Sequence, residues 1–269
     1  MKDPRWLRWS LLTLALGFLA LFVGLPIVTV FVEAFRKGSA AYLEAIRDPE
    51  TLSAVKLTLI TAGISVPINL VFGIAASWLI AKYRFPFKGT LLTLIDLPFS
   101  VSPVIAGLIF VLLLGARGAL GPFLERHDMH VIFAMPGIVL ATTFITFPFV
   151  AREIIPIMQD LGNDEEEQAL TLGASGWQIL LRVTLPKVRW GILYGVILCN
   201  ARAMGEFGAV SVVSGHIRGQ TNTVPLQVEI LYNEYNLSGA FAVASILTIL
   251  ALGTLAGKKL IESRIRVRA

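Results

Sequence analysis

Long apolar stretches alternate with short polar segments along the chain. Four windows of about 20 residues contain no Asp, Glu, Lys or Arg, and they cover residues 11–32, 57–81, 131–150 and 239–257. Two further windows are apolar apart from isolated charges: residues 91–115 include Asp96, and residues 191–214 include Arg202 and Glu206. Because a helix needs about 20 apolar residues to cross the hydrocarbon core of a bilayer, this pattern predicts six transmembrane helices.

The composition agrees with a protein that lies almost wholly within a membrane. Of the 269 residues, 55% are hydrophobic and 15% are charged, and the mean hydropathy is +0.74. Ordinary soluble domains carry about a quarter charged residues, so the composition argues against a water-soluble monomer. We expect a single all-α polytopic membrane domain over residues 1–269, with no soluble domain attached and no internal repeats.

The first apolar window has the basic flank of a secretory signal, since Lys2, Arg5 and Arg8 precede it. Its apolar part is longer than the roughly 7–15 residues of a signal core, and no small-residue cleavage site is evident. We therefore expect an uncleaved first transmembrane helix.

The positions of Lys and Arg predict the orientation. Six spans put both termini on one side of the membrane. That side carries fifteen basic residues: Lys2, Arg5, Arg8, Lys82, Arg84, Lys88, Arg152, Arg182, Lys187, Arg189, Lys258, Lys259, Arg264, Arg266 and Arg268. The opposite loops carry seven, namely Arg36, Lys37, Arg47, Lys56, Arg117, Arg126 and Arg218. Basic residues favour the cytoplasmic side, so both termini are predicted to be cytoplasmic. Orientation charges also account for the pI near 9.5, and no nucleic-acid partner is expected.

A polar insert between the fourth and fifth spans interrupts the apolar pattern. Residues 165–188 read EEEQALTLGASGWQILLRVTLPKV. Asn163 and Glu166 are spaced like a capping box, and acidic residues at the start favour a helix that runs to about Leu172. Gly173 suits the left-handed residue that ends such a helix. Ser175 and Gln178 form a second capping box, so the insert is predicted to contain two short helices.

The second short helix has an amphipathic pattern. Trp177, Leu180, Leu181 and Thr184 follow at i, i+3, i+4 and i+7, which predicts one apolar face about two turns long. Pro186 is expected to stop or redirect the chain before the fifth span. Two interpretations remain open from the pattern: a hairpin resting on the membrane surface, or an apolar knob that fits a groove on a cytoplasmic partner.

The insert resembles the cytoplasmic signature loop of ABC importer permeases. The shared spacing is E-x-A-x3-G-x9-(I/V)-x-L-P, written here by Glu167, Ala169, Gly173, Val183, Leu185 and Pro186. The resemblance implies a type I importer permease (MetI-like) fold whose loop, residues 162–188, docks on an ATPase subunit. The implied coupling residues are Glu167, Ala169, Gly173, Trp177, Leu180, Leu181, Leu185 and Pro186.

The sequence lacks a phosphate-binding loop of its own. The stretch from Gly253 to Lys259 is one residue too short for G-x-x-x-x-G-K-[ST] and ends in Lys. We therefore expect no cofactor on this chain, with ATP and Mg²⁺ bound by a separate ATPase. The resemblance further implies that this chain lies in a bacterial inner membrane beside a sister permease. It also implies two ATPase subunits and an external binding protein as partners.

The fifth span narrows the resemblance to one branch. Residues 201–230 read ARAMGEFGAVSVVSGHIRGQTNTVPLQVEI, which is similar to permeases that import oxyanions. Longer segments, including GEFGAVSVVSG and LGASGWQILLRVTLP, are most similar to the W-type permease subunits of sulfate/thiosulfate importers. Molybdate or tungstate remains the alternative cargo within the same branch.

The residues themselves offer several candidates for an anion pathway. Arg202 and Glu206 lie at i and i+4 and therefore share a helix face, where they either line the pathway or form a structural pair. Asp96 would repel an anion, so we expect it to cap a broken helix or to pair with a basic group. Hydroxyls near the helix-breaking Pro98 and Pro103 or in the fifth span are further candidates, although such hydroxyls commonly bond their own backbone: Ser100, Ser102, Ser211 and Ser214.

Two rival functions fit the charges less well. In a secondary transporter, Asp96, Arg202 and Glu206 would form an ion-coupling relay. An intramembrane enzyme would need a converging set of catalytic groups, and none is apparent. His127 and His130 lack a third ligand for a metal site, and Cys199, the only cysteine, excludes a disulfide framework.

Overall fold

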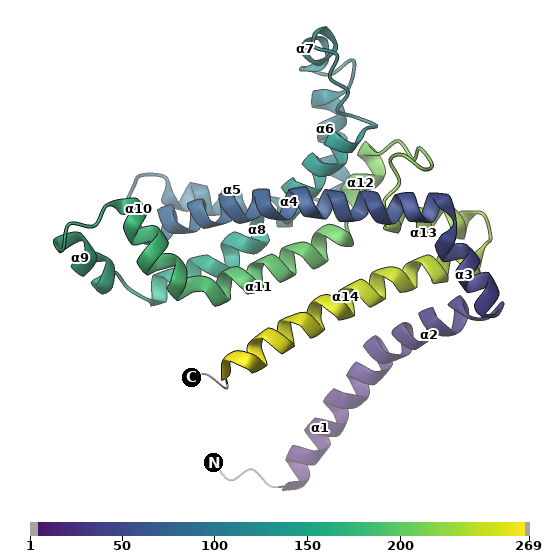
Figure 1. Ribbon diagram of the computed structural model, residues 1–269, viewed down its shortest axis with the longest axis horizontal. Helices are drawn as coiled ribbons and strands as arrows, with labels where there is room; N and C mark the ends of the chain where they lie inside the picture. The colour runs from purple at the N-terminus through teal and green to yellow at the C-terminus, as the bar shows by residue number, and fades with distance from the viewer. Residues whose placement is uncertain (1–4, 267–269) are drawn as a thin grey trace.

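The computed structural model describes residues 5–266, and within that range the ordered elements are helices without any strand. Figure 1 shows their arrangement. In chain order they are α1 (Arg5–Leu19), the π-helical segment η1 (Ala20–Gly24), α2 (Leu25–Ala34), α3 (Ser39–Arg47), α4 (Pro49–Lys82), α5 (Lys88–Ser100), α6 (Pro103–Leu114), α7 (Gly121–Arg126), α8 (Met135–Asp160), α9 (Asp164–Thr171), α10 (Gly176–Ile179), the π-helical η2 (Leu180–Thr184), α11 (Leu185–Met204), α12 (Gly208–Val213), α13 (Val224–Asn233) and α14 (Leu237–Arg266).

The first predicted span forms a continuous helical rod made of α1, η1 and α2. Its apolar window is entirely unburied within this chain, and Figure 1 shows the rod diverging from the main body. The π-helical turn η1 ends two residues before Pro26. A wider turn there accommodates the missing N–H of proline without ending the helix.

The centre of the molecule is a bundle of α4, α8 and α11. Its buried core includes Val66 of α4, Val150 and Ile154 of α8, and Cys199 of α11. Asn69 of α4 is fully buried and donates a 2.7 Å hydrogen bond to the Thr146 hydroxyl of α8. Small residues and interhelical hydrogen bonds of this kind hold membrane helices together, where apolar burial gives little discrimination from lipid.

The six predicted spans differ in how they are built. Within the described residues, four helices are long and apolar enough to span a membrane: 6–34, Pro49–Lys82, Met135–Asp160 and 237–254. The third predicted span consists of α5 and α6, which are bent by 104°. The fifth is α11 followed by α12, and α11 carries Lys187, Arg189 and Arg202. The predicted kinks at Pro98 and Pro103 thus become a sharp break after Ser100, whereas α4 continues through Pro67.

The two interrupted spans pack against each other at their breaks. A Cβ on Gly208, the first residue of α12, would lie 2.9 Å from Cβ of Pro103, the first residue of α6. A Cβ on Gly107 would lie 2.8 Å from the Ala209 carbonyl oxygen. Glycine at both positions therefore lets α6 and α12 approach at backbone distance.

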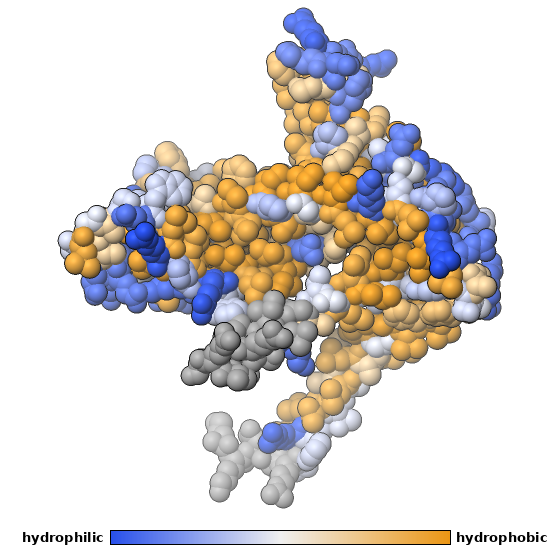
Figure 2. All heavy atoms as spheres, in the orientation of Figure 1, coloured by the Kyte–Doolittle hydropathy of each residue, from blue (hydrophilic) through white to orange (hydrophobic). Residues whose placement is uncertain are grey.

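Polar surface collects at the two ends of the long axis and at the tip formed by α7, and Figure 2 shows the apolar surface between them. One polar end is formed by α9 and α10, beside the last turn of α4. The other is formed by α3, α13 and the segment at 215–223, beside the first turn of α4. There Arg218 pairs with Glu234 and with Glu50, and the hydrogen bond that Arg218 donates to Glu234 raises the pKa of the Arg218 guanidinium.

Candidate functional site

The polar insert folds as two short helices around a glycine turn, as predicted. Acidic residues occupy the whole first turn of α9, where they interact favourably with the positive end of the helix dipole. The predicted capping box of Asn163 and Glu166 is wrong, because the Asn163 side chain makes no cap hydrogen bond. Both side chains instead bond to other elements.

Gly173 adopts a positive φ of 85°, which confirms the predicted left-handed position after α9. The Gly173 N–H donates to the Leu170 carbonyl, and the Ala174 N–H donates to the Ala169 carbonyl. These bonds close the end of α9. The chain then turns directly into α10.

The predicted capping box of α10 is confirmed. The Ser175 hydroxyl accepts from the Gln178 N–H, and the Gln178 side chain accepts from the Ser175 N–H at 2.8 Å. Pro186 does not stop the chain: α10, η2 and α11 follow one another without a gap. As at Pro26, a π-helical turn ends two residues before the proline and absorbs its missing N–H, while Figure 1 shows the helix changing direction here.

The predicted single apolar face of the second helix is wrong. Trp177 and Leu181 are exposed, but Leu180 and Thr184 are buried within the chain, together with Ile179. The π-helical turn alters the angular spacing of these positions, which the 3.6-residue period assumed to be constant.

Four large apolar side chains of the insert are exposed, two at the end of α9 and two on α10 and η2. We call this set the docking face: Leu170, Leu172, Trp177 and Leu181. Trp177 is 69% exposed and Leu172 is 88% exposed. Of the other signature residues, Glu167, Gly173 and Pro186 are exposed, whereas Ala169 and Leu185 are partly buried. Large exposed apolar side chains at a polar end of the molecule are typical of a protein contact.

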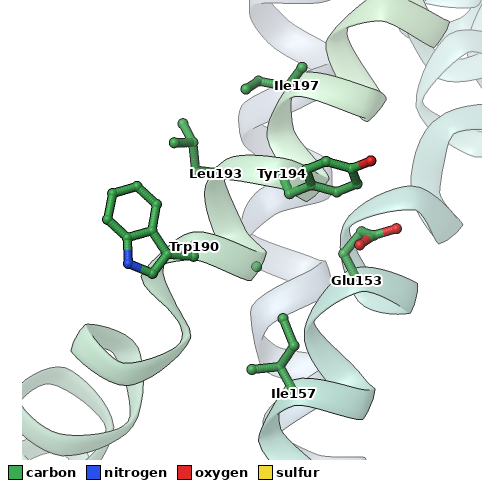
Figure 3. A pocket seen from close by; sticks show the side chains of 7 residues that line it. Glu153, Ile157, Trp190, Leu193, Tyr194 and Ile197 are labelled. Carbon is green, nitrogen blue, oxygen red and sulfur yellow. The ribbon is translucent and has the colours of Figure 1, made fainter. Parts of the chain in front are cut away.

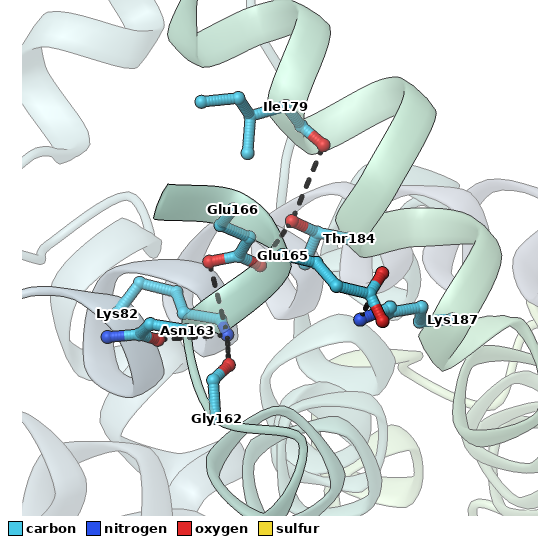
Figure 4. Close-up of polar contacts among 8 residues, drawn as sticks. All are labelled: Lys82, Gly162, Asn163, Glu165, Glu166, Ile179, Thr184 and Lys187. Atoms are coloured by element: carbon cyan, nitrogen blue, oxygen red, sulfur yellow. Dashed lines mark hydrogen bonds and ion pairs between the residues drawn. The ribbon is translucent and has the colours of Figure 1, made fainter. Parts of the chain in front are cut away.

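The inner side of the insert carries a polar network that the sequence did not reveal, drawn in Figure 4. The Lys82 ammonium lies 3.1 Å from a carboxylate oxygen of Glu166 and donates to the Asn163 side-chain oxygen at 3.1 Å. The second Glu166 oxygen accepts from the Thr184 hydroxyl at 2.7 Å. Sequence reasoning assigned Lys82 to orientation and Thr184 to an apolar face, and no local motif marks their long-range contact.

The charged residues of the fifth span form the predicted i, i+4 pair. A guanidinium nitrogen of Arg202 lies 2.6 Å from one Glu206 oxygen, and the other Glu206 oxygen accepts from the Ala209 N–H at 2.9 Å. The Glu206 side chain is fully buried, while that of Arg202 remains 33% exposed. Because its side chain is buried, Glu206 fits a structural role in the helix pair better than a role in the anion pathway. Of the two residues, only Arg202 is accessible to a solute.

The four candidate serines are in different environments. Ser100 and Ser102 are exposed at the break between α5 and α6, and Ser102 forms no side-chain cap hydrogen bond at α6. Ser211 donates to the Gly208 carbonyl at 2.9 Å, which is the backbone bond expected of membrane hydroxyls. Ser214 is buried and accepts from the His216 N–H, so it does not face a solute in this conformation.

Asp96 pairs with a basic group, as predicted. Its carboxylate accepts a 2.7 Å hydrogen bond from Nε of Arg152 in α8. The Arg152 guanidinium also lies 4.5 Å from the centroid of the Phe99 ring. The ion-pair partner of Asp96 is therefore Arg152 of α8 and not Arg202.

An open groove of about 410 Å³ lies between α8 and α11, and its lining consists of Glu153, Ile157, Trp190, Gly191, Leu193, Tyr194 and Ile197. Figure 3 shows Glu153 as the acidic side chain among apolar and aromatic ones. No predicted site residue lines the groove.

The two histidines considered for a metal site, His127 and His130, follow α7. The Nδ1 atom of His127 lies 2.8 Å from the Phe123 carbonyl oxygen. Among the residues that the structure describes, no group of three His, Cys, Asp or Glu side chains is arranged to hold a metal ion.

Comparison with known structures identifies the fold. A chain of a bacterial alginate ABC transporter superposes with a TM-score of 0.81 over 97% of this chain and 95% of that chain, at 17% sequence identity. A chain of the MetNI methionine ABC transporter gives a TM-score of 0.60 over 78% of this chain and 93% of that chain, at 18% identity. The predicted all-α, MetI-like permease fold is confirmed.

Comparison with curated sequences gives much closer relatives. The chain is 49% identical over 264 residues to the sulfate transport system permease protein CysW of Escherichia coli K12, covering 98% of this chain and 91% of the relative. It is 52% identical to CysW of Synechococcus elongatus, covering 95% and 91%. Identity falls to 34% with CysT of Escherichia coli K12, covering 94% and 92%, so the predicted likeness to the W-type subunit is confirmed.

A family model for the binding-protein-dependent transport system inner membrane component matches residues 69–267. The matched region contains the two interrupted spans and the whole insert with its docking face. On the strength of this match and of the near full-length similarity, the chain belongs to the family of binding-protein-dependent transport system inner membrane components.

Proposed function

We propose that this chain is a permease subunit of an ATP-driven sulfate/thiosulfate importer. The observation that carries the proposal is its identity of about one half, over nearly the full length, to permeases named for sulfate transport. The chain would form half of a translocation pathway, with a sister permease of the T type as the other half. It makes and breaks no bond in the solute.

The energy would come from a separate ATPase that contacts the docking face. The four docking-face side chains are exposed in a chain whose polar end otherwise carries charges, and burying them against a partner is favourable by about 25 cal/mol per Å² of apolar surface. ATP and Mg²⁺ would be bound by two copies of that ATPase. An external binding protein would deliver the anion to the opposite end, beside α3 and residues 215–223.

The anion pathway is proposed to pass the point where the two interrupted spans meet. Ser102 at the start of α6 is exposed, and the N-terminus of a helix offers free N–H groups and a favourable dipole to an anion. Arg202, at the end of α11, supplies the positive charge that is still accessible. Glu206 holds this arginine and the start of α12 in place and would not touch the solute.

Transport follows if ATP stabilises one of two arrangements of the permease pair. A ligand shifts a conformational equilibrium only by its differential affinity for the two states. The closed ATPase dimer would bind the docking faces in their outward-open arrangement, and ATP hydrolysis would release them. The solute therefore moves because the pathway changes its opening.

The test is uptake of labelled sulfate by vesicles that contain both permeases, the ATPase and the binding protein. We expect uptake that requires ATP and that thiosulfate inhibits while molybdate does not. Inhibition by molybdate alone would move the cargo to the molybdate/tungstate alternative. Uptake by this chain alone in an ion gradient would favour a secondary transporter. In the structure, however, Asp96 pairs with Arg152 and not with Arg202, the partner it would need in an ion-coupling relay.

A further inference from the structure

Three oxygen atoms of the insert surround the Lys82 ammonium group. It donates hydrogen bonds to the Gly162 carbonyl oxygen and to the Asn163 side-chain oxygen. It also forms an ion pair with one Glu166 carboxylate oxygen at 3.1 Å. The Lys82 side chain is only 7% exposed and that of Glu166 only 15%, in contrast to the usual solvent-exposed surface pair.

Glu166 extends this contact to a third element. Its second carboxylate oxygen accepts from the Thr184 hydroxyl in η2, and Thr184 is 2% exposed. Lys82 ends α4, Glu166 lies in α9 and Thr184 lies in the π-helical turn before α11. We call these three residues the clasp. Separating its charged pair would leave a desolvated charge without a partner, which is strongly unfavourable.

The helix that the clasp holds reaches the other polar end of the molecule. With 34 residues, α4 is about 51 Å long at 1.5 Å per residue. Its first turn carries Glu50, which pairs with Arg218 of the opposite loop. Farther along, the Thr58 hydroxyl oxygen accepts from the Val224 N–H at the start of α13. A displacement of α4 would therefore also displace the segment at 215–223 and α13, which these contacts join to it.

We infer that Lys82 is a positioning residue that makes the docking loop and α4 move as one body, so that displacement by the ATPase reaches the opposite end of the molecule. The inference rests on the proposed function, because it assumes that the ATPase moves the loop. Lys82 lies on the inner side of the loop and outside the docking face. Its loss should therefore leave ATPase attachment intact while weakening the transfer of motion.

The test compares Lys82→Met with a matched pair in the same loop. Lys187 and Glu165 lie 2.6 Å apart with side chains 29% and 60% exposed, so the control variant Lys187→Met breaks an ion pair of the same chemistry that water screens. Each variant is assembled with its sister permease and ATPase in vesicles. Sulfate uptake and ATP hydrolysis are then measured in the same preparation, together with the amount of ATPase retained on the complex.

We expect Lys82→Met to keep the ATPase and its hydrolysis while lowering sulfate taken up per ATP by about tenfold, within the range known for coupling residues. Lys187→Met should keep the wild-type ratio. Glu166→Gln provides a second variant if Lys82→Met fails to fold, because it removes the charge and keeps an oxygen for Thr184; it should lower the same ratio.

Three results would overturn the inference: an unchanged ratio in Lys82→Met and Glu166→Gln, an equal loss in Lys187→Met, or loss of the ATPase from the complex. A wild-type complex that hydrolyses ATP without any sulfate uptake would instead refute the proposed function. Failure of the inference is therefore seen in the variant complexes, whereas failure of the proposed function is seen in the wild-type complex.

Discussion

At the scale of single residues, Gly173 owes its identity to backbone conformation rather than to packing. Its φ of 85° is rare for residues with a side chain, yet an ideal Cβ at this position would meet no atom within 4 Å. A substitution therefore costs conformational energy without any steric clash. The corner between α9 and α10 sets the relative placement of Leu172 and Trp177 in the docking face, so the glycine links a backbone angle to the shape of a surface.

Gly173→Val should abolish most ATP-driven sulfate uptake while the protein remains in the membrane. A β-branched residue at positive φ costs about 1–3 kcal/mol, which the loop relieves by changing its corner. Gly173→Asn should be the mildest substitution, since Asn tolerates this region. Uptake into vesicles and the amount of permease in membranes are measured together.

Gly176→Ala is the matched control for that experiment. Gly176 begins α10 with no positive φ, and its added Cβ would lie 3.9 Å from the Trp78 ring, an ordinary contact. Near-normal uptake is expected from this variant. Normal uptake by Gly173→Val would show that the corner carries no coupling function.

At the scale of elements, hydrophobic windows predicted where the helices lie but not how they end or bend. The apolar run at 91–115 fits one straight span by length, and the sequence marks Pro98 and Pro103 without giving the 104° angle between α5 and α6. Likewise, the capping box at Ser175 is local and was predictable. The Glu166–Thr184 contact of the clasp joins residues 18 positions apart within the insert. Lys82 lies far from both in sequence, so its place in the clasp follows only from the packing of α4 against the insert.

The G-x-x-x-G spacing occurs in this chain at residues 191–195 and again at residues 253–257, and the two occurrences differ in structure. A Cβ on Gly195 of α11 would lie 3.1 Å from Cα of Val150 in α8, whereas a Cβ on Gly253 of α14 would meet nothing within 4 Å. Gly195 therefore permits a close helix contact. Gly253 makes no such contact with the described part of the chain.

Gly195→Leu should destabilise the permease by about 1–3 kcal/mol or more, because backbone atoms of α8 leave no space for the side chain. The measurement is the thermal denaturation midpoint of the detergent-solubilised complex, followed by size-exclusion chromatography. Gly253→Leu is the matched control with the same change in volume. Equal midpoints for the two variants would contradict the close contact between α8 and α11.

At the scale of the whole molecule, α4 runs between two polar ends that differ in the surface they present. One end presents the docking face and the clasp, and the other presents α3, α13 and the loop that contains Arg218. Figure 1 shows α2 and α14 meeting the α3 end, so the start of α1 and the end of α14 point toward the other side. An even number of crossings, as predicted from the sequence, agrees with this arrangement. Which end faces the cytoplasm was predicted from Lys and Arg alone.

Cysteine labelling tests that orientation. Cys199 is buried, and a Cys199→Ser background removes it as a source of signal. Leu172→Cys places a thiol on the docking face, while Tyr232→Cys places one on the exposed side of α13 at the opposite end. A membrane-impermeant maleimide should label Tyr232→Cys in spheroplasts, and it should label Leu172→Cys only in inverted vesicles.

The ATPase adds a second condition to the same measurement. If it covers the docking face, inverted vesicles that contain the ATPase should show slower labelling of Leu172→Cys than vesicles without it, and labelling of Tyr232→Cys from the outer side should not change. Labelling of Leu172→Cys in spheroplasts would reverse the orientation and would place the docking face where no cytoplasmic ATPase can reach it. An ATPase that uses cytoplasmic ATP can contact the permease only on its cytoplasmic side. A docking face on the outer side would therefore contradict both the predicted orientation and the proposed energy source.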